Sequence, residues 1–153
     1  MMHPTLTDTT SPGFARRCGA LAYDGLLLAA LWMAVSALVL ALSGGWLAEP
    51  ERPMWLVYVL RAILVLVTGL FFGSFWTNGG QTLGMRTWRL RLVSSADAGP
   101  VSWKQVLLRL AAAWFSAGAL GLGFFWVLID RERRSWHDRL SGTHLVVVPA
   151  KKP

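Results

Sequence analysis

The chain has 153 residues, 54% of them hydrophobic and only 15% charged, with a mean hydropathy of +0.46 and a formal net charge of +7. A soluble domain carries more charge than this, so the composition indicates a membrane protein. The positive charge would suit a nucleic-acid-binding protein, but in so apolar a chain it more often records membrane topology and contact with anionic lipid headgroups. We therefore expect the lipid bilayer and its anionic headgroups as partners, and no nucleic acid.

Cysteine and histidine are too sparse for a disulfide or a metal site. Cys18 is the lone cysteine, and His3, His137 and His144 are scattered along the chain. A disulfide needs two cysteines, and a zinc site needs several clustered cysteine or histidine ligands. The sequence predicts no metal and no cofactor.

Two segments, residues 18–43 and 54–76, are long and apolar enough to cross a bilayer as helices, which takes about 20 residues. The first follows Arg16 and Arg17 and would also suit a cleaved signal peptide. It is longer than the usual apolar core of ~7–15 residues, and Asp24 interrupts its start. We therefore expect a permanent helix.

The distribution of basic residues orients these helices. The loop between them carries Arg52 beside two glutamates, whereas basic residues gather before the first helix and after the second. Those residues are Arg16, Arg17, Arg86, Arg89, Arg91 and Lys104. Because basic residues favour the cytoplasmic side, we expect a multi-pass membrane protein with a cytoplasmic N-terminus.

A third apolar segment covers residues 102–130. It carries Arg109 near its start and contains Gly118, Gly121 and Gly123. A full crossing would translocate the basic tail that follows, against the positive-inside bias. A plain third transmembrane helix and a re-entrant segment are the two alternatives, and the charge of the tail favours re-entry.

Two strand patterns flank this segment and also favour re-entry. Residues 87–93 alternate polar and apolar side chains within a loop over 86–101, and residues 143–148 are rich in β-branched side chains. Short strands gain stability by pairing, which requires both on one membrane face. We therefore expect a helix over about 102–117, a turn at 118–123 and a short helix that returns by residue 129.

Three charged residues lie inside or beside the apolar segments: Asp24, Arg61 and Arg109. A charge at the centre of a membrane helix costs roughly 2.5–3.5 kcal/mol on insertion scales, so each needs a partner or water. Arg109 enters from the same end as Asp24, and we expect these two to pair. The pair would either pin the segments together or handle an ion.

Gly69 and Gly73 form a small-residue face on the second helix, beside Thr68 and Ser74. Such a face lets another helix approach closely. We expect it to pack against the first helix, with a homodimer as the alternative.

The pair His137-Asp138 suggests a hydrolase, but the ligands or the nucleophile that such chemistry needs are missing. A metal-dependent enzyme would need further histidine and aspartate ligands, and neither Ser135 nor Ser141 has the context of a serine nucleophile. We expect no catalytic residue. Asp138 is predicted to cap a local turn or to pair with a nearby arginine, the candidates being Arg86, Arg89, Arg131 and Arg134.

Three stretches together resemble the RDD family of small bacterial membrane proteins, named for one arginine and two aspartates. They are "RCGALAYD", "NGGQTLGMRTWRLRLV" and "IDRERRSWHDRLSGTHLVV", and the resemblance extends from Phe14 to Val148. The family arginine corresponds to Arg17, and its aspartates correspond to Asp24 and Asp138. "GQTLGMR" is similar to the family's "GxTxGK" segment, with Met85 in place of a common lysine.

The resemblance implies transport of a small ion or ligand, with cation/proton exchange at Asp24 as one form of it. The expected charge network is Arg17, Asp24, Arg109 and Asp138, and the secondary candidates are Arg61, Gln81, Thr82, Asp130 and His137. Because one short chain has few membrane helices for a transporter, we expect a homo-oligomer. The alternative is a non-transporting adaptor or assembly factor that binds a protein partner or anionic lipid.

The expected fold is an all-α membrane protein with two transmembrane helices, a third re-entrant or spanning segment and a small cytoplasmic β element. Residues 14–148 would form one RDD-type domain, in which 131–148 make a juxtamembrane segment and a strand. A flexible arm over 1–13 would precede the domain, and a tail over 149–153 would follow it.

Overall fold

The structure is a computed structural model that describes residues 11–149. Most of the predicted arm and tail therefore lie outside the described residues. Two long helices dominate, α1 (Phe14–Leu42) and α2 (Met54–Thr77), joined by a loop that contains the 3-10 turn η2 (Trp46–Ala48). Both are long and apolar enough to cross a membrane, which confirms the two predicted spans. α1 begins four residues before the predicted start.

The third apolar segment is a bent pair of helices. α4 (Trp103–Gly118) begins with a capping box between Ser102 and Gln105, and α5 (Leu122–Phe125) continues as the 3-10 turn η3 (Trp126–Leu128). The two pieces meet at an angle of 108°. The break falls at Gly121, whose φ of 76° lies in the left-handed region that favours glycine.

Two strands form a small antiparallel sheet, β1 (Leu90–Ser94) and β2 (Thr143–Val147), with Leu92 opposite Leu145. The predicted pairing is confirmed, although β1 begins later than predicted because the preceding residues end the short helix α3 (Leu83–Thr87). The apolar segment is therefore flanked by two strands of the same sheet, and its bent helices form either a re-entrant segment or a broken span.

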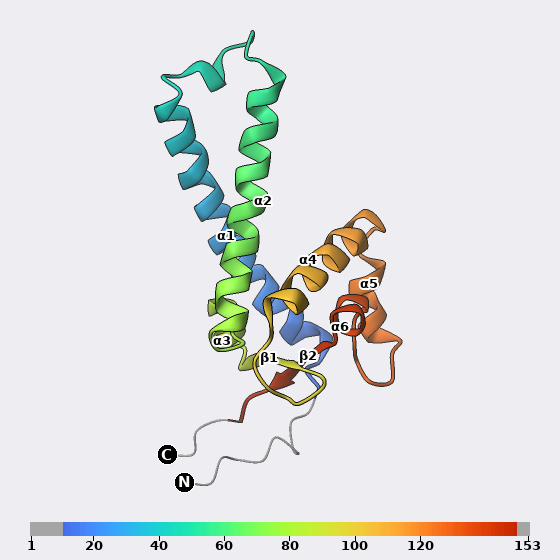
Figure 1. Cartoon of the computed structure of the whole chain (residues 1–153). Helices are drawn as coiled ribbons and strands as arrows, with labels where there is room; N and C mark the ends of the chain where they lie inside the picture. Colours follow the sequence, from blue (N-terminus) through green and yellow to red (C-terminus); the bar gives the residue numbers. More distant parts are fainter. Residues whose placement is uncertain (1–10, 150–153) are drawn as a thin grey trace.

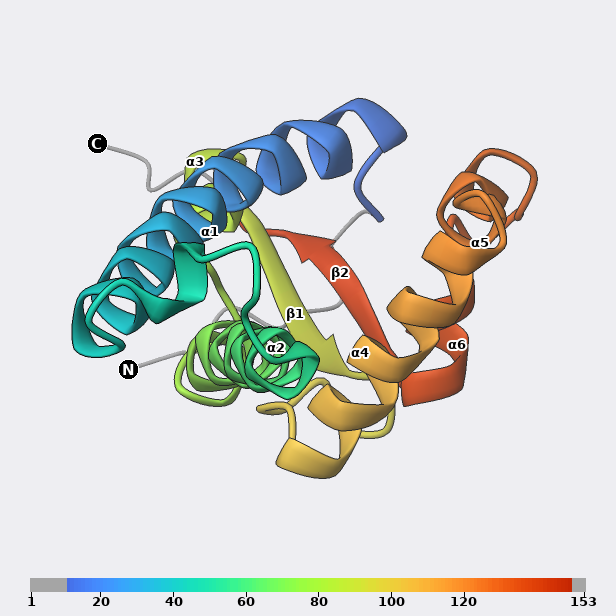
Figure 2. The same cartoon turned by 90° about the horizontal axis from the view of Figure 1, so that it is seen from above.

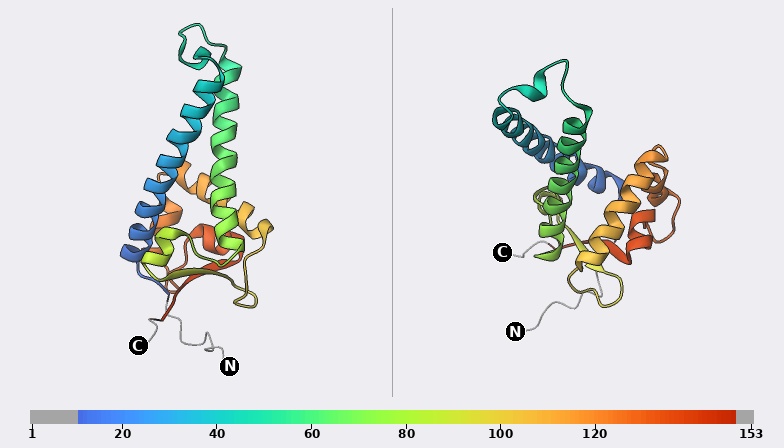
Figure 3. Two further views of the ribbon diagram at one scale, coloured as in Figure 1. Left: turned by 90° about the vertical axis from the view of Figure 1, so that its left-hand side faces the viewer. Right: turned by 45° about the horizontal axis from the view of Figure 1, so that its top comes forward.

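The sheet lies at the foot of the molecule, and the α1–α2 hairpin rises from it (Figures 1 and 3). Seen from above, the sheet lies between α1 and α2 on one side and α4 on the other, with the short helix α6 (Trp136–Ser141) beside α4 (Figure 2). The sequence did not predict α3 or α6. Buried side chains of the sheet and the surrounding helices form the core: Leu90, Leu92, Leu145, Val106, Met85, Trp76 and Ala20.

Gly69 and Gly73 of α2 pack against α4 and not against α1 as predicted, whereas the adjacent Thr68 accepts a hydrogen bond from Trp32 of α1. A Cβ added at Gly73 would lie 2.2 Å from the ring of Trp103, and one at Gly69 would lie 4.0 Å from Leu110. The absent side chain at Gly73 makes room for a tryptophan ring at the start of α4. The sequence could not identify this partner because any neighbouring helix can use such a face.

Candidate functional site

The first turn of α6 holds a carboxylate in the protein interior. The Ser135 backbone N–H donates to Asp138 Oδ2 over 3.0 Å, and the Asp138 N–H donates to Ser135 Oγ over 3.3 Å. This reciprocal cap satisfies N–H groups that the first turn of a helix otherwise leaves unpaired. Asp138 is only 1% exposed. The predicted capping role of Asp138 is confirmed.

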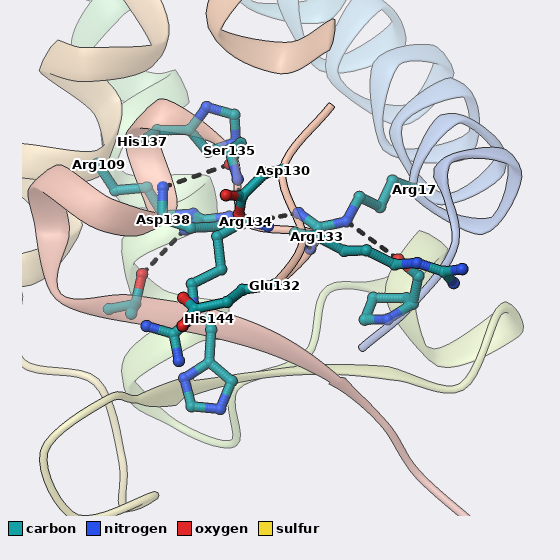
Figure 4. Close-up of polar contacts among 12 residues, drawn as sticks. Arg17, Arg109, Asp130, Glu132, Arg133, Arg134, Ser135, His137, Asp138 and His144 are labelled. Atoms are coloured by element: carbon teal, nitrogen blue, oxygen red, sulfur yellow. Dashed lines mark hydrogen bonds and ion pairs between the residues drawn. The ribbon is translucent and has the colours of Figure 1, made fainter. Parts of the chain in front are cut away.

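Two arginines from distant parts of the chain share this carboxylate (Figure 4). Arg17 Nη1 donates to Asp138 Oδ2 over 2.8 Å, and Arg109 Nη1 donates to Asp138 Oδ1 over 2.6 Å. Both arginines are buried. We call Arg17, Arg109 and Asp138 the charged cluster.

Further hydrogen bonds connect the charged cluster to its surroundings. Arg17 Nη2 donates to the carbonyl oxygen of Arg133 over 2.7 Å, and Arg109 Nη1 also donates to Thr143 Oγ1 over 2.9 Å. Thr143 is the first residue of β2. The charged cluster therefore joins α1, α4, α6 and the sheet at one buried point.

The charges of the cluster keep Asp138 ionised. Burial by itself raises the pKa of Asp138, but the positive charges of Arg109 and Arg17 outweigh burial and hold the pKa below its usual range. Two guanidinium groups against one carboxylate leave a surplus of positive charge. Breaking such a buried pair by removing one partner typically costs about 3–5 kcal/mol of stability.

Asp24, on α1, binds α3 instead of Arg109. Its Oδ2 accepts a hydrogen bond from the Thr82 hydroxyl, and its Oδ1 accepts from the Gly84 backbone N–H over 2.9 Å. A Cβ at Gly84 would lie 2.4 Å from the carbonyl oxygen of Ala20, so α3 and α1 are in close contact. The predicted pair of Asp24 and Arg109 is wrong because Asp24 faces α3 whereas Arg109 faces α6.

The arginines predicted as partners of Asp138 do not contact it in the part of the chain that the structure describes. They are Arg86, Arg89, Arg131 and Arg134. The sequence favours these four because they share a membrane face with Asp138 or lie close to it in the chain. The actual partners, Arg17 and Arg109, come from the apolar helices α1 and α4.

The secondary candidates Gln81 and Asp130 support the backbone around the site. Gln81 Nε2 donates to the carbonyl oxygen of Leu90 over 2.6 Å and so links the start of α3 to β1. Asp130 accepts from the Arg134 backbone N–H over 2.9 Å and forms an ion pair of 2.6 Å with Arg139. The hydrogen bond from the Arg134 backbone has the largest effect on the pKa of Asp130 and lowers it, and the ion pair with Arg139 lowers it further.

Arg61 lies apart from the charged cluster. Its side chain is exposed on α2, and its guanidinium carbon lies 5.9 Å from the centre of the Tyr58 ring. This is within the range of a cation–π contact. Among residues 11–149 it forms no ion pair.

His137 is buried and neutral. Burial, followed by the positive charge of Arg109, lowers the pKa of His137 to about 3, against the opposing charge of Asp138. The imidazole stacks on Phe124 with 6.1 Å between ring centres. Ser141 Oγ donates to the backbone carbonyl of His137 and not to its ring. Within residues 11–149, no three acidic, histidine or cysteine side chains gather as metal ligands would.

A cavity of about 320 Å³ adjoins the charged cluster, between α1, α2 and α4. The sheet contributes Leu90, Leu92 and Leu145 to its wall, which is mostly apolar. Its volume falls at the lower end of the ~300–1,000 Å³ typical of small-molecule sites. Leu21 on α1 and Ala117 on α4 also line it and are exposed, so the cavity opens between these two helices.

The cavity wall also contains polar groups without partners. Arg17, Asp24, Arg109 and His137 all line the cavity. Among the described residues, three buried side-chain atoms of this wall have no hydrogen-bond partner: Trp76 Nε1, Ser116 Oγ and His137 Nδ1. Unsatisfied buried polar atoms are rare in folded proteins, and each requires an explanation, such as a role in binding.

Sequence reasoning missed several residues of the site. The spacing of Ser135 and Asp138 is a capping signal and could have predicted the start of α6. Trp76 is the last residue of the second predicted span, and Ser116 carries no motif at all. Both line the cavity between α1, α2 and α4, and local sequence patterns do not indicate that arrangement.

Comparisons with known proteins agree with the sequence resemblance. The RDD family model matches residues 11–142. One curated relative is "Uncharacterized protein RP437" of Rickettsia prowazekii (strain Madrid E), which is 27% identical over 94 residues. The match covers 58% of this chain and 52% of that protein, so the chain spans about half the length of the curated relative it matches. No solved structure gives a significant match.

Proposed function

Because the chain belongs to the RDD family, we propose that this membrane protein binds a small solute in the cavity and transports it across the cell membrane. The observation that carries the proposal is the cavity itself. It lies where the apolar helices meet the charged cluster, and three buried polar atoms of its wall have no partner among the described residues. A solute would supply those partners.

The proposed orientation places the sheet and the N-terminus in the cytoplasm, at a bacterial inner membrane. Arg86, Arg89 and Arg91 lie in or beside α3 and β1 at the sheet end. The loop at the opposite end of the α1–α2 hairpin contains Glu49 and Glu51. The positive-inside bias supports this assignment.

The charged cluster and Asp24 would serve this function as a scaffold. The charged cluster fixes α1, α4 and α6 around the cavity, and Asp24 fixes α3 against α1. Both oxygens of Asp24 already accept hydrogen bonds from α3. A cation exchanged at Asp24 would therefore have to displace these bonds, so the geometry supports cation/proton exchange less well than transport of a solute held by the other polar groups.

A homo-oligomer belongs to the proposal. Many secondary transporters combine two structural repeats around a central site. Within residues 11–149, two long helices and the bent pair are the segments that could cross or enter the membrane. Two or more copies would supply the further helices.

A non-transporting adaptor is the second candidate, and the basic surface near the sheet favours it. Five arginines there are exposed and could bind anionic lipid or an acidic partner: Arg86, Arg89, Arg91, Arg131 and Arg133. An adaptor has no need of the cavity, and this difference separates the two candidates.

Uptake into liposomes that contain the purified protein tests the proposal. One arm would apply a sodium gradient and follow internal pH with a trapped dye. The other would follow radiolabelled octanesulfonate, a permanently charged probe that cannot cross the bilayer in a protonated form. We expect either a faster change of internal pH or a faster uptake of octanesulfonate than in empty liposomes.

A cavity-filling variant connects uptake to the cavity. Ala113 lines the cavity, whereas its neighbour Ala111 lies exposed on α4 outside it. Ala113→Trp is expected to abolish uptake, and the matched control Ala111→Trp is expected to retain it. Uptake no faster than in empty liposomes, or equal uptake by both variants, would contradict the proposal. The first of these results would favour the adaptor.

A further inference from the structure

The unused hydrogen-bonding capacity beside the charged cluster is mainly that of donors. The indole N–H of Trp76 can only donate, and it has no partner among the described residues. Arg109 makes its side-chain hydrogen bonds through Nη1, and its Nε and Nη2 make none within residues 11–149. By contrast, both oxygens of Asp24 and both oxygens of Asp138 already accept hydrogen bonds. A complementary ligand would present acceptors.

Two of these donor residues, Arg109 and Trp76, lie close together in the cavity wall. The guanidinium carbon of Arg109 is 5.4 Å from the centre of the Trp76 ring. His137 precedes Asp138, whose Oδ1 binds Arg109, and its Nδ1 is unpartnered. Ser116 lies seven residues further along α4, about 10 Å from Arg109 at a rise of ~1.5 Å per residue. Arg109 and Trp76 thus lie side by side in the cavity wall, and His137 lines the same cavity. We call these three residues the headgroup patch.

The rest of the cavity suits a short apolar chain. Phe72, Leu110 and Ala113 line it together with leucines of the sheet. Its volume of about 320 Å³ would hold about ten water-sized groups at ~30 Å³ each. A single chain of roughly eight to ten carbon atoms fits this space.

The opening of the cavity faces the direction in which the helices would meet lipid. Leu21, at its rim on α1, is 54% exposed. On α4, next to the other rim residue, Trp114 and Phe115 are exposed on the outer surface. An apolar molecule dissolved in the bilayer could therefore enter sideways between α1 and α4.

We infer that the cavity binds a single-chain amphiphile with a carboxylate headgroup, which enters from the bilayer and places its oxygens on the headgroup patch. Charge-assisted hydrogen bonds to Arg109 would hold the carboxylate, with the Trp76 N–H as a second donor. The inference rests on the proposed function, because it names the class of solute that the cavity takes.

Photolabelling of the full-length protein in vesicles of neutral phosphatidylcholine tests this inference. The probe is a ten-carbon fatty acid with a diazirine at the end of its chain, and its methyl ester is the control. Mass spectrometry would locate the labelled residues. We expect the acid to label the cavity wall near Phe72 or Leu110, and excess decanoate to compete with this labelling. The ester is expected to label only lipid-facing residues.

A pair of tryptophan variants tests the headgroup patch. Trp76→Phe removes the indole N–H and keeps an aromatic ring, and we expect decanoate to compete about tenfold more weakly, as for the loss of one hydrogen bond. Trp114→Phe is the matched control, since Trp114 is 59% exposed on α4 and does not line the cavity. Unchanged labelling by the ester in both variants would show that the fold is retained.

Two results would overturn the inference: equal labelling of the cavity by acid and ester, or equal competition in Trp76→Phe and in the native protein. The labelling is independent of transport. Acid-selective labelling without uptake into liposomes would contradict the transport function and leave the binding site standing. Uptake blocked by Ala113→Trp without acid-selective labelling would contradict the ligand class and leave transport standing.

Discussion

Arg17 binds Asp138 across 121 positions of the sequence, with 2.8 Å between Nη1 and Oδ2. The contact joins the first turns of the first long helix to a short helix that follows the bent apolar segment. Arg17, which the resemblance matches to the family's arginine, thus pairs with Asp138 and not with Asp24. Asp24, seven residues after Arg17, secures α3 instead.

Removing the shared carboxylate should destabilise the protein. In Asp138→Asn, two buried guanidinium groups would lose their counter-charge, at a cost of about 3–5 kcal/mol. We expect a large fall of the midpoint of thermal unfolding in detergent. Asp97→Asn is the control, because Asp97 lies in an exposed turn after β1. Equal midpoints for the two variants would show that the charged cluster does not stabilise the fold.

A methyl group at Gly84 should disturb the contact between α3 and α1. The new Cβ would lie 2.4 Å from the carbonyl oxygen of Ala20 and 2.8 Å from Asp24 Oδ1. We expect Gly84→Ala to lose about 1–3 kcal/mol, the usual cost of overpacking. Gly118→Ala should be tolerated, because a Cβ there meets nothing within 4 Å. A Gly84→Ala protein as stable as Gly118→Ala would contradict the close approach.

Acid should destabilise the protein through His137. The pKa of His137 falls from 6.5 to about 3 on folding, chiefly because the ring is buried. Between these values the unfolded chain binds a proton that the folded chain does not. The free energy of unfolding is therefore highest above about pH 6.5. It declines as the pH falls, by up to about 1.4 kcal/mol per pH unit. The depressed pKa of Asp138 adds a loss only below about pH 4.

The measurement is the midpoint of thermal unfolding between pH 6.5 and 4.5, in the native protein and in His137→Phe. The variant should show a weaker dependence on pH. His144, whose pKa is also lowered by burial, remains in both proteins and contributes equally. The same slope in both proteins would mean that His137 is not kept neutral by the fold.

The sequence predicted the elements better than their contacts. The apolar runs of α1 and α2 exceed the length of a membrane span, and the β-branched run of β2 favours a strand. Local sequence patterns therefore predict these elements. Such patterns do not predict the partner of Arg109. It depends on how α4 packs against α6, two helices that lie on either side of the 108° bend in the chain. Residues from both sides of the bend, Ser116 and Phe124, line the cavity.

Labelling of single cysteines tests the re-entrant geometry. With Cys18→Ser as the background, cysteines introduced at Ser95 and Glu132 flank the bent segment, and one at Glu51 lies in the loop between α1 and α2. A membrane-impermeant thiol reagent should label Ser95→Cys and Glu132→Cys from the same side, and Glu51→Cys from the other. Labelling of the first two from opposite sides would show a third full crossing.

Arg17 and Asp138 are expected to act as one buried unit, and a double-mutant cycle measures the coupling between them. The free energy of unfolding would be measured for Arg17→Gln, for Asp138→Asn and for the protein with both changes. We predict that the double change costs about 1–3 kcal/mol less than the two single costs added together. Strict additivity would contradict this expectation, because residues that do not interact lose their contributions independently.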